Sequence, residues 1–71
     1  MKTLEAALLA AHDAGDRHAL VTLYQQAAET VSGAERAFFL TQAHVFAMEL
    51  AHPAAEALRA QLVEMGREEP L

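Results

Sequence analysis

The stretch from Ala34 to Ala51, AERAFFLTQAHVFAMELA, constrains the fold most because it has more apolar surface than a helix at the edge of a small protein needs. On a helix with about 100° per residue, its apolar residues cover one broad side and part of a second. All three phenylalanines of the chain lie in this stretch. We therefore predict a central helix that the rest of the chain covers. The residues predicted to face inward are Phe39, Ala43, Phe46, Ala47 and Leu50.

Local signals divide the chain into four helices. Asp16 and Ser32 are residue types that cap helix N-termini, and Glu35 follows Ser32 at the spacing of a capping box. Gly15 supplies the left-handed residue that commonly ends a helix, and Pro53 disfavours helical geometry in the residue before it. These signals predict helices over about 4–13, 17–30, 33–51 and 53–65.

The other three helices each carry an apolar stripe at the i, i+3, i+4, i+7 spacing of one helix face. We expect these stripes to cover the central helix. The residues predicted to face inward are Leu4, Ala7, Leu8 and Ala11, then Leu20, Leu23, Tyr24, Ala27 and Val31, and finally Ala55, Leu58, Leu62 and Met65.

Composition favours an all-α fold of a single domain. Alanine occupies 17 of 71 positions and β-branched residues are scarce, which favours helix over strand. The length suits one domain over 1–71, made of two helical hairpins over about 3–31 and 32–66 and a short tail over 67–71. In a chain this small, a lone hydrophobic core is only marginally sufficient for stability.

Charge and cysteine content restrict the class of partner. The net charge of -5 has the wrong sign for attracting phosphates, so we expect no nucleic acid partner. No apolar run approaches the roughly 20 residues that span a membrane, and Glu5 interrupts the N-terminal run, so we expect neither a membrane span nor a signal peptide. The absence of cysteine excludes disulfides and favours a cytoplasmic location.

The two halves of the chain resemble each other at an offset of 35 residues. This offset places six apolar pairs in register, and it relates pairs of helices rather than single helices. The six pairs are Leu4 with Phe39, Leu8 with Ala43, Ala11 with Phe46, Leu20 with Ala55, Leu23 with Leu58, and Ala27 with Leu62.

The stretch AGDRHALVTLYQQAA resembles the tetratricopeptide repeat family, with that family's Gly-Asp turn followed by a helix that has Leu20, Tyr24 and Ala27 in its packing positions. The resemblance covers about residues 4–66 and implies four antiparallel helices in two stacked helical hairpins. The chain departs from the family where Leu4 and Phe39 stand in place of an early tryptophan. An up-down four-helix bundle is the alternative arrangement.

The resemblance also implies a function in protein–protein interaction. In this family the first helix of each hairpin lines a shallow groove that receives a partner's peptide. Leu9 lies off the inward stripe of its helix, which fits such an exposed position. Carried over to this chain, the partner-binding groove comprises Glu5, Leu9, His12, Leu40, His44 and Met48.

An excess of apolar residues on the central helix predicts self-association. Phe38 and Val45 lie outside the stripe that the other helices cover, and leaving such side chains in water is unfavourable. A twofold contact is the commonest way to cover such a patch. We expect a homodimer with Phe38 and Val45 in the interface.

The four histidines suggest only a competing hypothesis. Imidazole is a common ligand of zinc and nickel, so the alternative function is a sensor of a metal or small ligand that uses His12 and His44. No two histidines have the i, i+4 spacing that places two ligands on one helix face, so we predict no metal site and no cofactor. The chain has no glycine-rich phosphate loop or nucleophile motif, and we expect no enzymatic activity.

Overall fold

The computed structural model of the chain describes residues 3–66, and within them the chain forms four α-helices and no strand. They are α1 (Leu4–Ala14), α2 (Arg17–Glu29), α3 (Gly33–Glu49) and α4 (Ala54–Glu64). The prediction of an all-α chain is confirmed, and each helix begins and ends within two residues of its predicted position. The predicted tail over 67–71 lies outside the described residues.

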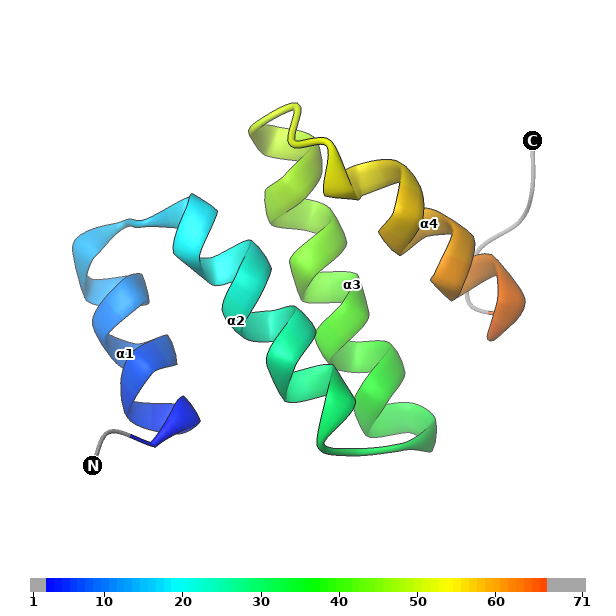
Figure 1. Cartoon of the computed structure of the whole chain (residues 1–71), viewed down its shortest axis with the longest axis horizontal. Coiled ribbons are helices and arrows are strands. Elements are labelled where there is room, and N and C mark those ends of the chain that lie inside the picture. The colour runs from blue at the N-terminus through cyan, green and yellow to red at the C-terminus, as the bar shows by residue number, and fades with distance from the viewer. Residues whose placement is uncertain (1–2, 67–71) are drawn as a thin grey trace.

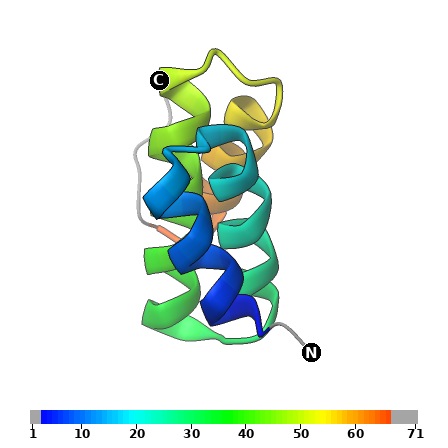
Figure 2. The same ribbon diagram turned by 90° about the vertical axis from the view of Figure 1, so that its left-hand side faces the viewer.

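The four helices form a thin layer. Close backbone contacts join α1 to α2, α2 to α3 and α3 to α4, and no other pair of helices in the described part of the chain makes them (Figure 1). The Cα atoms extend over 39 × 26 × 14 Å. Seen from the α1 end, α1 crosses in front of the space between α2 and α3 (Figure 2). None of the described helices combines the length and hydrophobicity that crossing a membrane requires.

The first two helices begin and end where the sequence signals predict. The Thr3 hydroxyl accepts a hydrogen bond from the Ala6 amide at 3.1 Å, and an Asp16 carboxylate oxygen accepts one from the Ala19 amide at 3.1 Å. Gly15 ends α1 with a φ of 65°, a left-handed conformation that glycine adopts without steric cost. Side-chain capping and one glycine therefore fix the tight connection between α1 and α2.

The start of α3 differs from the prediction. Ser32 makes no side-chain capping hydrogen bond, so the predicted capping box with Glu35 is wrong. The reason lies in Gly33, whose φ of 63° turns the backbone in the left-handed sense directly after Ser32. A capping box needs right-handed helical geometry from the first residue after the cap, because only then does the serine hydroxyl reach the third amide.

The connection between α3 and α4 contains the one left-handed residue other than glycine in the described chain. Ala51 has a φ of 52°, and the next amide, that of His52, donates a hydrogen bond to the Ala47 carbonyl at 2.8 Å. Pro53 has no side-chain acceptor with which to cap α4. The Nδ1 atom of His52 accepts the hydrogen bond from the Ala54 amide at 3.0 Å instead.

The core lies where α3 packs against α2 and α4. Leu58 and Leu62 of α4 are fully buried, as predicted, and so are Ala43 and Ala47 of α3. Partly buried aromatic and aliphatic side chains surround this cluster. The buried residues that form it are Val21, Ala28, Leu40, Ala43, Ala47, Leu58 and Leu62.

Part of the buried surface of α2 lies outside the predicted inward stripe. Val21 and Ala28 are fully buried, although the predicted inward stripe contains neither of them. Leu20 and Ala27, which the stripe does contain, are buried as well. The helix is covered on two sides because it packs against both α1 and α3, whereas a single amphipathic stripe assumes cover on one side.

We predict that truncation of Leu58 destabilises the protein far more than the same truncation at an exposed site. Leu58→Ala removes a fully buried side chain and should lower the free energy of unfolding by about 2–5 kcal/mol. Leu9→Ala, at a position that is 63% exposed, is the matched control and should change it by less than about 0.5 kcal/mol. Urea unfolding followed by circular dichroism measures both. Equal midpoints for the two variants would show that α4 does not cover the core.

We also predict that glycine at position 51 stabilises the fold. Alanine in the left-handed region costs roughly 1–2 kcal/mol, which exceeds the entropic cost of glycine in the unfolded chain. Ala51→Gly should therefore raise the free energy of unfolding by about 0.5–1 kcal/mol. Ala57→Gly, inside α4 and exposed, should lower it by about 1 kcal/mol. A loss of stability in Ala51→Gly would contradict the left-handed turn.

Candidate functional site

One face of α3 exposes three large apolar side chains. Phe38, Val45 and Met48 are 56%, 44% and 62% exposed. Phe38 and Val45 are seven residues apart, which is nearly two full turns, and Met48 follows after three more residues, so the three lie along one side of the helix. We call these three residues the α3 stripe. Thr41 lies between them in the sequence and is also exposed.

The residues predicted for the partner-binding groove do not all lie at an open surface. Glu5, Leu9, His12 and Met48 are exposed. Leu40 and His44, however, are only 2% and 7% exposed. The prediction that these two line an open groove is wrong.

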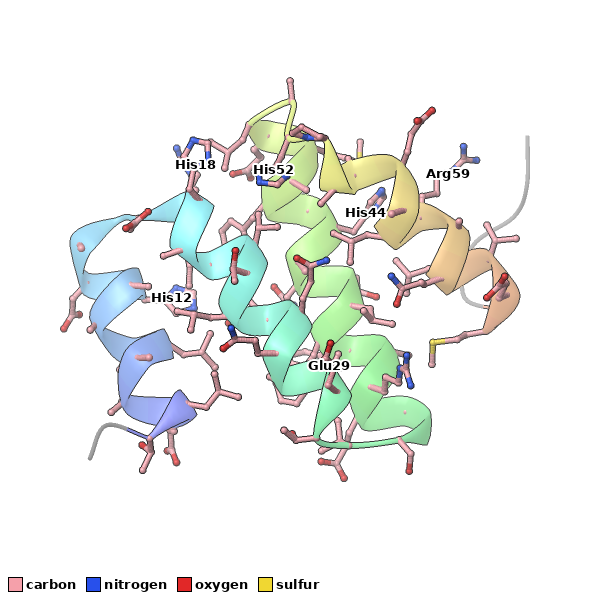
Figure 3. The ribbon with its side chains drawn as sticks, in the orientation of Figure 1. His12, His18, Glu29, His44, His52 and Arg59 are labelled. Atoms are coloured by element: carbon pink, nitrogen blue, oxygen red, sulfur yellow. The ribbon has the colours of Figure 1, made fainter. Side chains whose placement is uncertain are left out.

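Packing of α4 against α3 explains the burial of Leu40 and His44. Leu40 belongs to the same core cluster as Leu58 and Leu62 of α4. His44 follows Leu40 by four residues and therefore lies on the same side of α3, where it faces α4 (Figure 3). The side of α3 that stays open is the one that carries the α3 stripe.

An aromatic cluster joins α1, α2 and α3. The Nε2 atom of His12 and the hydroxyl of Tyr24 share a hydrogen bond of 2.8 Å. The Tyr24 ring is stacked on Phe46 at 6.0 Å and lies 6.1 Å from Phe39, and the His12 ring meets Phe46 edge-on at 6.0 Å. The predicted groove residue His12 therefore holds α1 against the other two helices.

The alternative pairing of His12 with His44 does not form. His12 contacts Phe46, which is two residues and about 200° around α3 from His44. Figure 3 shows His12 beside α1 and His44 on the side of α4. Between residues 3 and 66, no group of three or more potential metal-binding side chains is arranged around a common point.

A different pair of histidines does meet at one end of the helices. The rings of His18 and His52 lie 5.9 Å apart, and Figure 3 shows both at the end where α2 begins and α3 ends. An ion pair of 3.2 Å between Nε of Arg17 and Oε2 of Glu49 joins the same two helix ends. Both side chains of this ion pair are about half exposed, so its contribution to stability is small. Sequence spacing gives no sign of either contact, because residues more than 30 apart meet only through the packing of α2 on α3.

A shallow groove lies on the side of the molecule where α1 is close to both α2 and α3. It has a volume of about 370 Å³. Five of its lining residues are apolar, and two glutamates, one from α1 and one from α3, contribute carboxylates. We call it the three-helix groove, and its lining residues are Leu4, Glu5, Leu8, Ala27, Thr30, Val31, Glu35 and Phe39.

No protein family model matches this chain, and no curated protein and no solved structure shows significant similarity to it. Indications of function therefore come from the surface of this chain alone. Two features stand out on it: the α3 stripe, and the three-helix groove with its two carboxylates.

We predict that the contact between His12 and Tyr24 contributes to stability. In a double-mutant cycle with His12→Ala and Tyr24→Phe, the coupling energy should be about 0.5–1 kcal/mol, since each substitution removes the hydrogen bond. A second cycle with His18→Ala and Tyr24→Phe is the control and should be additive within about 0.5 kcal/mol. Unfolding free energies from urea titrations give both values. Additivity in the first cycle would show that α1 is not held by this contact.

Proposed function

We propose that this protein is a protein–protein interaction module that forms a homodimer through the α3 stripe. The exposure of Phe38, Val45 and Met48 is the observation that supports the proposal. Burial of a large apolar side chain contributes roughly 1.5–3 kcal/mol, so three in line form a substantial driving force for association. Monomeric proteins seldom leave such contiguous apolar patches open.

A second copy of the same chain suits the α3 stripe for an electrostatic reason. The chain carries a net charge of -5, so most contacts between two copies bring carboxylates together. The three stripe residues and the neighbouring Thr41 are uncharged. Two copies can therefore meet there with little repulsion, and a twofold axis closes such a self-complementary contact.

We also propose that the four helices form two stacked hairpins similar to tetratricopeptide repeats. Support comes from the ribbon, which reverses direction at each connection between helices (Figure 1). Further support comes from α1 and α4, which make no close backbone contact in the described part of the chain. A closed up-down bundle would bring its first and fourth helices together.

The proposed partner-binding surface differs from the one predicted by the resemblance. Leu9 remains an exposed candidate, at 63%, whereas Leu40 and His44 are buried and Met48 belongs to the proposed dimer contact. The competing hypothesis is a sensor of a metal or small ligand that uses His12 and His44. It has no geometric support, because His12 of α1 contacts α3 at Phe46 whereas His44 of α3 faces α4.

The absence of cysteine favours a reducing compartment such as the cytoplasm.

We predict that light scattering at micromolar concentration gives twice the chain mass of 7.7 kDa. Phe38→Glu and Met48→Glu should each give a folded monomer, because a buried carboxylate opposes association while an exposed one is tolerated. Ala57→Glu, at an exposed position of α4, is the control and should remain dimeric. Circular dichroism verifies that the variants are folded. A wild-type protein that stays monomeric at high micromolar concentration would contradict self-association.

A further inference from the structure

The three-helix groove adjoins the α3 stripe at Phe38, whose ring meets the Phe39 ring edge-on at 5.6 Å, but it has a different chemical character. Leu4 and Leu8 of α1 form one part of its apolar wall. The other part comes from Val31, in the connection between α2 and α3, and from Phe39 of α3. None of these four side chains is fully buried. The volume of about 370 Å³ lies at the lower end of the roughly 300–1,000 Å³ that is typical of ligand pockets. The groove can therefore accept apolar side chains of a bound segment rather than a large ligand.

Two carboxylates give the groove a negative charge. Glu5 lies in the first turn of α1 and Glu35 in the first turn of α3, and both side chains are exposed. Among the described residues, no lysine, arginine or histidine lines the groove. Neither glutamate forms an ion pair within residues 3–66. Both carboxylates are therefore available to a cation that arrives with a ligand.

The geometry points to a peptide-binding site in the three-helix groove for an amphipathic segment that carries lysine or arginine beside its apolar residues. The apolar side chains enter between α1 and α3, and the basic groups meet Glu5 and Glu35 at the surface. This inference rests on the proposed function in that the protein acts through protein contacts, but it requires neither the α3 stripe nor the homodimer.

The occupant is a segment of another protein rather than a second copy of this chain. With ten acidic and five basic residues, a second copy brings mostly like charge toward Glu5 and Glu35. One of the basic residues, Arg17, is already paired with Glu49. A basic partner segment gains attraction both from the groove and from the net charge of the whole chain.

A titration with two synthetic peptides tests this inference. The probe is a 15-residue peptide with leucine on one helical face and lysine on the other, and the control peptide has glutamate in place of every lysine. The ¹⁵N-labelled protein is observed by NMR, and the affinity is measured by fluorescence anisotropy at low and high salt. We expect the lysine peptide to shift the amide signals of Leu8, Thr30 and Phe39, and salt to weaken its binding. The glutamate peptide should not bind.

Charge-matched variants separate the groove from the overall charge of the chain. Glu5→Gln with Glu35→Gln should weaken binding of the lysine peptide about five- to tenfold at low salt, because two charge contacts are lost. Glu56→Gln with Glu64→Gln removes two exposed carboxylates from α4 and should weaken it less than about twofold. Met48→Glu, in the α3 stripe and more than two helical turns from Phe39, serves as a third variant and should retain binding in the groove.

Several results would overturn the inference. Equal weakening in the two double variants, or equal binding of the two peptides, would show that the groove carboxylates do not select the ligand. Shifts centred on Val45 and Met48 would place the peptide on the α3 stripe. Groove signals that move with protein concentration alone would identify a second copy as the occupant. If the lysine peptide fails to bind while light scattering still gives a dimer, this inference fails and the proposed function stands.

Discussion

The close approach of α2 and α3 is the contact on which the rest of the structure depends. Alanines occupy its buried centre, since Ala28 of α2 and Ala43 and Ala47 of α3 are fully buried in the core cluster. Small side chains allow two helix backbones to come near each other but fill little volume. Leu58 and Leu62 of α4 supply the bulk that the alanines lack. The core is thus compact but narrow, which agrees with a shortest dimension of 14 Å for the Cα atoms.

A layer this thin cannot bury both of its faces. The side of α3 toward α4 holds Leu40 and His44 inside, and the adjoining side, about a quarter turn around the helix, leaves Phe38, Val45 and Met48 in solvent. On the α1 side, an aromatic cluster adds to the packing of the buried Ala11, and the three-helix groove remains open beside it. The proposed dimerisation and the inferred peptide site both follow from the same limit, because a chain of 71 residues has too few side chains to cover its own surface.

The positions of the helices could be predicted from the sequence because their ends are marked by local chemistry. Asp16 caps α2 and Gly15 ends α1 through interactions with immediate neighbours, which sequence spacing reveals. The side of each helix that is buried was harder to predict. Val21 was missed because α2 has two neighbouring helices, and no single amphipathic stripe describes that situation. Likewise, no local signal showed that Leu40 faces α4.

Contacts between distant residues account for the other differences. His18 and His52 meet only because the start of α2 lies beside the end of α3. The predicted capping box at Ser32 does not form for a local reason, because Gly33 takes a left-handed φ. A glycine at this position permits that φ but does not require it. Leu9, Phe38 and Val45 are exposed, in keeping with their positions outside the predicted inward stripes, whereas the predicted groove combined the exposed Met48 with the buried Leu40 and His44. The sequence did not reveal the three-helix groove, whose lining residues come from three helices.

Intermolecular nuclear Overhauser effects test whether a second copy of the chain covers the α3 stripe, as we propose. An equal mixture of ¹³C,¹⁵N-labelled and unlabelled protein is recorded with isotope filtering, so that only contacts between different copies give signals. We expect cross-peaks from the Phe38 ring of one copy to the methyl groups of Val45 and Met48 of the other. Cross-peaks that instead connect residues of α4, or no intermolecular cross-peaks in a sample that is dimeric by mass, would contradict the proposed contact.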